Sequence, residues 1–131
     1  MTVGIKPTSG QQLIDGDYVN GVAAGLNATT QSGVTAAGTN QATAFPITAG
    51  AALVSVDTVA SSTGINLPSA LAGIEISIYN NGANTLNVFP AVANNPITAA
   101  QDTINNSTST TIASHVSKVV YCPKNGIWAA Q

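Results

Sequence analysis

The stretch that decides the fold reads Ile74-Glu-Ile-Ser-Ile78-Tyr-Asn80-Asn-Gly82-Ala-Asn84-Thr-Leu-Asn-Val-Phe89. In its first part three isoleucines fall on one face and Glu75 and Ser77 on the other, which predicts a half-buried β-strand. The Asn- and Gly-rich centre supplies residues that tolerate the positive φ of a hairpin turn. The stretch therefore predicts a β-hairpin between strands at 74–79 and 85–89.

Similar short runs recur along the chain, separated by Gly, Asn and Pro. The sequence Pro123-Lys-Asn-Gly126 predicts a second hairpin, between strands at 117–121 and 127–129. The other predicted strands cover 42–47, 52–59 and 108–112. Many short strands at this spacing predict a mainly β fold, an antiparallel, jelly-roll-like β-sandwich or barrel. No fixed-period repeat is visible, so a β-solenoid is disfavoured.

The first 32 residues have a different character. Residues 1 to about 12 predict an extended arm whose apolar anchors are Val3 and Ile5. Residues 14–28 predict the one helix of the chain, because apolar side chains recur there every four residues. These side chains are Ile14, Tyr18, Val22 and Leu26. We therefore expect an arm and short helix over 1–32 and a β domain over 33–131.

The predicted helix is weak on its own. Gly16, Gly21 and Gly25 each cost about 1 kcal/mol relative to alanine, so the helix needs a surface to dock on. Its apolar stripe fits its own domain and a partner surface equally well. The expected partner-binding residues are those of the arm and the stripe: Val3, Ile5, Ile14, Tyr18, Val22 and Leu26.

Charge is scarce throughout. Three lysines and five acidic residues make up 6% of the 131 residues, against roughly 25% in an ordinary domain. Three scattered lysines cannot neutralise a run of phosphates, so neither nucleic acid nor an anionic membrane is an expected partner. The N-terminus lacks the apolar region of a signal peptide, which predicts synthesis in a cytoplasm without secretion by that route. A surface this neutral has little repulsion between copies and is typical of a packed assembly.

Catalysis is not expected. General acid–base chemistry needs ionisable groups brought together, and Asp57, Glu75, Asp102 and His115 lie far apart in the sequence. The single cysteine, Cys122, excludes an intrachain disulfide and has no obvious cationic partner to activate it. No cofactor or metal is expected, although a trimer could place three copies of His115 around one axis.

Several features together carry a resemblance to a known group. A run Gly33-Val-Thr-Ala-Ala-Gly38-Thr-Asn-Gln-Ala-Thr43 precedes the strand at 53–59, and Leu67-Pro68 and Gly73 precede the strand that ends at Asn80. The turn at 81–84, the pattern Leu86-x-Val88-x-Pro90 and the terminal Gly126-Ile-Trp128 follow. In this pattern the chain resembles small virion proteins of tailed bacteriophages.

The resemblance implies a β-rich, trimeric virion protein without catalytic residues. Such proteins occur as head decoration (cement) proteins and as tail or fibre components. We expect a decoration protein on the outer capsid surface, made in the bacterial host cytoplasm, that binds the major capsid protein and itself as a homotrimer. The alternative is a tail-tip or tail-fibre module that binds a host surface glycan, with Tyr79 and Trp128 as aromatic platforms.

Overall fold

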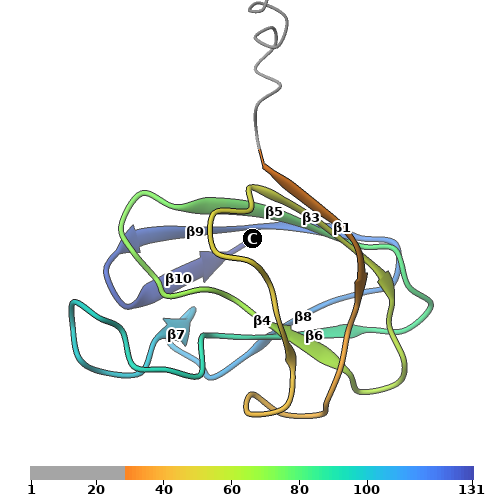
Figure 1. Cartoon of the computed structure of the whole chain (residues 1–131), viewed down its shortest axis with the longest axis horizontal. Coiled ribbons are helices and arrows are strands. Elements are labelled where there is room, and N and C mark those ends of the chain that lie inside the picture. Colours follow the sequence, from red (N-terminus) through yellow and green to blue (C-terminus); the bar gives the residue numbers. More distant parts are fainter. Residues whose placement is uncertain (1–28) are drawn as a thin grey trace, which may run out of the picture.

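The computed structural model describes residues 29–131, which fold as a mainly β domain without a helix in the described part. The predicted arm and helix, with Val3, Ile5 and the Ile14–Leu26 stripe, lie outside the described residues. Within the described residues the strands form a six-stranded sheet, β1-β3-β5-β9-β10-β7, and a four-stranded sheet, β2-β4-β6-β8 (Figure 1). The strands are β1 Thr30–Thr35, β2 Phe45–Pro46, β3 Leu53–Thr58, β4 Gly64–Asn66, β5 Glu75–Asn80, β6 Leu86–Phe89, β7 Thr103–Ile104, β8 Thr110–Ile112, β9 Ser117–Lys124 and β10 Ile127–Ala130.

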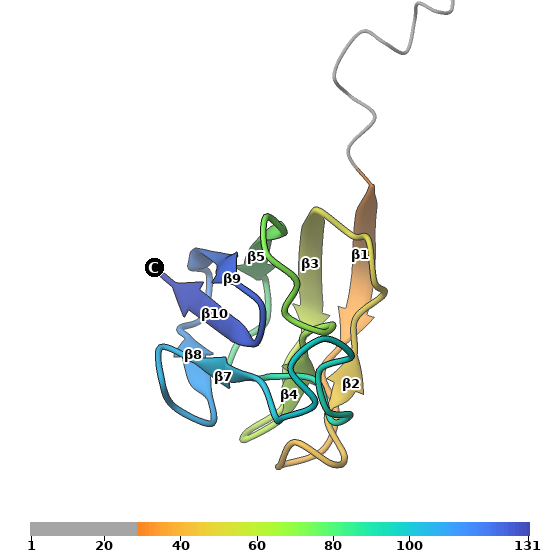
Figure 2. The ribbon, with the colours of Figure 1, turned by 90° about the vertical axis from the view of Figure 1, so that its left-hand side faces the viewer.

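The first six strands wind as a coil. Odd-numbered strands enter one sheet and even-numbered strands the other, and within each sheet they pair in parallel. The register runs Thr30–Leu53–Ser77 in the larger sheet, in steps of 23 and 24 residues. Figure 2 shows β1, β3 and β5 side by side. This half of the domain is a short β-solenoid of three turns. The predicted mainly β fold is confirmed, but the predicted antiparallel sandwich or barrel is wrong, because these six strands coil and pair in parallel.

The solenoid leaves no visible repeat because equivalent positions hold different residues. Val34, Val56 and Asn80 are aligned across three neighbouring strands and all are buried. Phe45, Ile65 and Val88 form a similar column in the smaller sheet. A solenoid needs a buried side chain at each aligned position, but the residue at that position can differ from one turn to the next. The absence of a sequence repeat therefore gave no reason to reject a solenoid.

Antiparallel strands extend both sheets, and β7 pairs in parallel with β10 at the edge of the larger one. β8 pairs with β6, and β9 pairs with β5 and β10. The predicted C-terminal hairpin is confirmed, since Lys124 pairs with Ile127 and Gly126 adopts the left-handed φ of 90°. The strand runs on through Pro123, so the turn contains only Asn125 and Gly126.

The predicted hairpin at 80–84 is wrong, because its two strands enter different sheets. β5 belongs to the six-stranded sheet and β6 to the four-stranded sheet. The buried Asn80 side chain holds this corner: its Oδ1 accepts from the Gly82 amide at 2.9 Å, and its Nδ2 donates to the carbonyls of Asn84 at 2.8 Å and Ile112 at 2.9 Å. Asn and Gly residues form a turn here as expected, but the turn carries the chain from the six-stranded sheet to the four-stranded sheet.

The core lies between the two sheets. Trp128 is its largest side chain and is fully buried. The other large buried side chains are aliphatic: Ile65, Leu67, Ile76, Ile78, Leu86, Ile104 and Ile112. Asn66, in the second turn of the solenoid, links it to the turns on either side. Its Nδ2 donates to the carbonyls of Gln41 at 3.0 Å and Pro90 at 3.2 Å. The described residues hold no helix long and apolar enough to cross a membrane.

Candidate functional site

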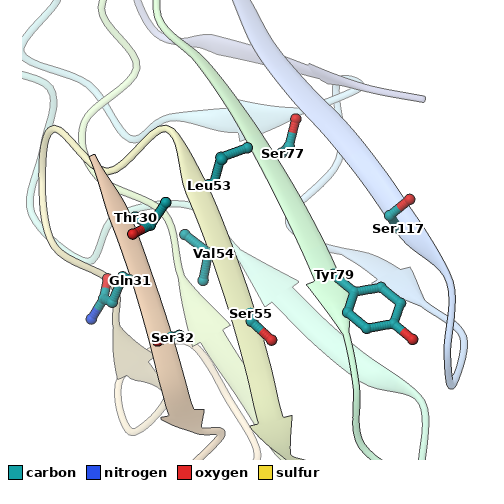
Figure 3. A pocket seen from close by; sticks show the side chains of 9 residues that line it. All are labelled: Thr30, Gln31, Ser32, Leu53, Val54, Ser55, Ser77, Tyr79 and Ser117. Carbon is teal, nitrogen blue, oxygen red and sulfur yellow. The ribbon is translucent and has the colours of Figure 1, made fainter. Parts of the chain in front are cut away.

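A shallow groove of about 290 Å³ opens on the outer face of the six-stranded sheet (Figure 3). It crosses β1, β3, β5 and β9, and its lining is predominantly apolar and free of formal charge. The lining residues are Thr30, Gln31, Ser32, Leu53, Val54, Ser55, Ser77, Tyr79 and Ser117. None of these belongs to the arm or the apolar stripe that were expected to bind a protein partner, which lie outside the described residues. Tyr79 alone among them was considered from the sequence, as an aromatic platform for a glycan.

The groove follows from strand alternation and from the pairing of large with small side chains. Leu53 is 45% exposed and Tyr79 39% exposed, whereas Ile76 and Ile78 point into the core from the same sheet. Across the ladder Leu53 faces Ser77, and Tyr79 faces both Ser55 and Ser117. Directly opposite residues lie about 5 Å apart, so each short serine leaves a hollow beside a large side chain.

Asp57 anchors the strand at the rim of the groove. Its carboxylate accepts from the Ser55 hydroxyl at 2.5 Å, from Asn81 Nδ2 at 3.2 Å and from the Gly33 amide at 3.0 Å. Gly33 lies at an irregularity in the β1–β3 register and adopts a φ of 69°. The hydrogen bonds from Ser55, then from Asn81, lower the pKa of Asp57 from its ordinary value. The carboxylate therefore fixes the bulged edge strand to its neighbour.

This arrangement predicts a pH dependence. The folded pKa of Asp57 is lower than the unfolded pKa of about 3.9, so its contribution to stability is fully present above about pH 4. That contribution is lost as pH falls through the lowered folded pKa. We expect the urea midpoint of the wild type to fall more steeply than that of Asp57→Asn between pH 5 and pH 2. Ser55→Ala should give an intermediate slope, and parallel profiles for all three proteins would contradict the assignment.

A buried polar cluster supports the loop between β6 and β7. Asp102 is only 2% exposed; its Oδ2 accepts from the Ala70 amide at 2.7 Å and its Oδ1 from Asn95 Nδ2 at 2.9 Å. Asn95 Oδ1 in turn accepts from the Ile97 amide at 2.9 Å. The loop fixed in this way presents Val92 and Ile97, which are 55% and 64% exposed. The loop is a second exposed apolar feature of the described residues.

The four ionisable residues considered for catalysis have separate surroundings. Asp57 and Asp102 have the partners just described, and Glu75 lies opposite Tyr121 on the exposed face. His115 adopts a φ of 61°, and its Nδ1 lies 3.0 Å from the Ser114 hydroxyl. No hydrogen bond in the described part joins any two of the four. Residues 29–131 also hold no cluster of three potential metal ligands.

Cys122 and Trp128 are both core residues. The Cys122 thiol donates to the Lys124 carbonyl at 2.9 Å, and burial raises its pKa. Trp128 has no exposed surface, so it cannot be the glycan platform considered from the sequence. Tyr79 is partly exposed, but it lies in the apolar groove rather than among the amide-rich loops.

Comparison with known proteins adds no assignment. No protein-family model matches the chain, and no curated protein or solved structure matches it either.

Proposed function

We propose that this chain is a structural protein of a tailed-bacteriophage virion, namely a decoration protein on the outer surface of the capsid. It acts as a homotrimer that bridges major capsid subunits and so resists expansion of the shell. Binding only to the assembled lattice stabilises that lattice by mass action. The proposal rests first on the sequence resemblance to small phage virion proteins.

The structural observation that carries the proposal is the partly apolar outer face of the six-stranded sheet, which carries Asp57 and Glu75 but no formal charge within the groove. Leu53, Tyr79 and Tyr121 are exposed there, and no formal charge lines the groove between β1 and β9. An exposed apolar surface is typical of a protein that is covered in its working state. The exposed Val92 and Ile97 on a rigidly supported loop add a further contact of the same kind.

The direct test adds purified protein to undecorated heads and images the shell. We expect trimer-shaped density on the outer surface, and a mass of three 13.0 kDa chains for the free protein by light scattering. The double variant Val3→Ser, Ile5→Ser should reduce occupancy at least tenfold, because it removes the apolar anchors of the arm. Thr2→Ser with Thr8→Ser, a matched change in the same arm, should bind like the wild type. A shell without added density would overturn the proposal.

One observation favours the alternative, a tail-tip or fibre module that binds a host glycan. A polar hollow of about 280 Å³ is lined by Ser61, Ser62, Asn84, Thr85 and Asn87. Hydroxyl and amide groups of this kind can hydrogen-bond a sugar. Binding of host lipopolysaccharide by the wild type, lost on Thr85→Val and kept on Tyr79→Ala, would favour this alternative over capsid decoration.

A further inference from the structure

We propose that Asn81–Gly82 and Asn125–Gly126 are sites of a spontaneous covalent modification, deamidation of the asparagine, which hydrogen bonds of the folded domain suppress. Within the described residues these are the two places where glycine directly follows asparagine. Glycine has no Cβ to hinder the approach of its own amide nitrogen to the preceding side chain. The proposal holds whether or not the protein decorates a capsid.

The reaction uses only water and hydroxide. The glycine amide nitrogen gives its proton to hydroxide and forms a bond to Cγ of the preceding asparagine. The Cγ–Nδ2 bond breaks, and Nδ2 takes a proton from water and leaves as ammonia, which produces a five-membered succinimide. Water then opens the ring at one of its two carbonyls, giving aspartate or isoaspartate. The reaction therefore requires a free glycine N–H and an asparagine side chain that can turn toward it.

At the corner between the two sheets neither requirement is met. The Gly82 N–H is occupied, because it donates to Asn80 Oδ1 at 2.9 Å. The Asn81 side chain is exposed, but its Nδ2 donates to Asp57 Oδ1 at 3.2 Å. Gly82 lies so close to Val59 that an added Cβ would come within 2.7 Å of the valine side chain. The backbone at the corner therefore has little room to move.

The turn between β9 and β10 is restrained in the same two ways. The Gly126 N–H donates to the Ala70 carbonyl at 2.9 Å. Asn125 is half-buried, and its Oδ1 accepts from the Ala72 amide at 2.9 Å. Both partners belong to the connection between β4 and β5, so the turn is fixed to a distant part of the chain.

The two sites differ in how firmly the asparagine side chain is held. Asn81 is exposed and has a hydrogen bond of 3.2 Å, whereas Asn125 is half-buried and has one of 2.9 Å. Sites with more exposure and weaker hydrogen bonds open locally at a lower free energy than the whole domain unfolds. We therefore expect Asn81 to be modified before Asn125.

Modification of Asn81 has a defined structural consequence. An aspartate at this position loses the Nδ2 donor to Asp57 and places a second carboxylate beside it. Two carboxylates that share a site disfavour each other's charge. Because Asp57 also accepts from the Gly33 amide of β1, the modified protein should have a lower urea midpoint than the unmodified protein.

Ageing of the full chain at mildly alkaline pH tests the proposal. One sample is kept folded in buffer and the other unfolded in concentrated guanidinium chloride, and peptide mapping by mass spectrometry measures aspartate plus isoaspartate at each site. The ratio of the unfolded to the folded rate is the protection of that site. We expect at least tenfold protection at both sites, and more at Asn125 than at Asn81. Equal folded and unfolded rates at either site would overturn the proposal, and greater protection of Asn81 would overturn the expected order.

Variants at the corner test whether these hydrogen bonds control the reaction. Asn80→Ala frees the Gly82 N–H and should lower the protection of Asn81 at least tenfold relative to that of Asn125. Asn125 in the same chain controls for general unfolding, and the guanidinium sample controls for the altered neighbour.

A milder pair of variants at Asp57 tests the side-chain contact without removing the buried corner residue. Asp57→Ala removes the acceptor of Asn81 Nδ2 and should lower the protection of Asn81 at least threefold relative to Asn125. Asp57→Asn keeps an oxygen acceptor and should lower it less. If neither Asn80→Ala nor Asp57→Ala changed the ratio of the two protections, the hydrogen bonds of the corner would not suppress the reaction.

Discussion

Trp128→Ala is expected to lower the free energy of unfolding by about 3–5 kcal/mol, the usual cost of removing a large buried aromatic side chain. A domain of this size is stable by only about 5–15 kcal/mol in total. Trp128 has no exposed surface, and the remaining large core side chains are aliphatic. Because a protein interior is close-packed, these neighbours can fill the space only in part. Urea denaturation followed by circular dichroism should show a midpoint far below that of the wild type, or no folded baseline.

Two further variants make this result specific. Within the described residues Trp128 Nε1 is buried without a hydrogen-bond partner; such an unpaired donor costs about 1–3 kcal/mol. Trp128→Phe removes that donor and keeps most of the ring, so it should destabilise much less than Trp128→Ala. Tyr121→Ala truncates an aromatic side chain that is 36% exposed and should move the midpoint only slightly. An unchanged midpoint in Trp128→Ala would contradict the central place of this residue in the core.

Most strands were predictable because their residues alternate or are β-branched. The seven predicted runs correspond to β2, β3, β5, β6, β8, β9 and β10. The three missed strands lack those signals. β1 is a mostly polar edge strand in which only Val34 is buried, and β4 has three residues, all buried. β7 has only two residues, too few for any period to be visible.

The pairing of the strands could not be predicted, because local turn chemistry does not determine which sheet the next strand enters. An Asn-Gly turn has the same backbone needs in a hairpin and in a corner between two layers. The difference at 80–84 comes from Asn80, whose Nδ2 bonds to Ile112, 32 residues further along the chain. Such a long-range contact leaves no trace in the local pattern.

The groove was also invisible in the sequence. Its shape depends on Leu53 facing Ser77 and Tyr79 facing Ser55 and Ser117, and these pairs exist only once the register is known. The burial of Asp102 was missed for the same reason, since its main partner is the amide of Ala70, 32 residues earlier. The sequence did contain one signal of the groove. Leu53 and Tyr79 are large side chains on the exposed face of their strands, where small or polar residues otherwise alternate with the buried ones.

The corner at Asn80 gives the second large expected effect. Asn80→Ala removes the partner of the Gly82 amide and of the Asn84 and Ile112 carbonyls, in a place with no exposed surface. Each buried group left without a partner costs about 1–3 kcal/mol. We therefore expect a loss of about 3 kcal/mol or more in the free energy of unfolding, measured by urea denaturation.

Asn80→Asp separates the hydrogen bonds of the corner from its shape, because the two side chains are nearly the same size. The carboxylate can still accept from the Gly82 amide, but its second oxygen faces the Asn84 and Ile112 carbonyls in place of the amide donor. Burying a charge against two acceptors is strongly unfavourable. At neutral pH Asn80→Asp should therefore be no more stable than Asn80→Ala.

The pKa of the introduced carboxyl should be raised in the folded state. The Asn80→Asp variant should therefore regain stability relative to the wild type as pH falls through that pKa, because a protonated carboxyl can donate again. A matched change at an exposed position far from other carboxylates in the sequence, Asn106→Asp, should lack this recovery. If Asn80→Asp were as stable as the wild type at pH 7, the side chain would not hold the corner between the two sheets.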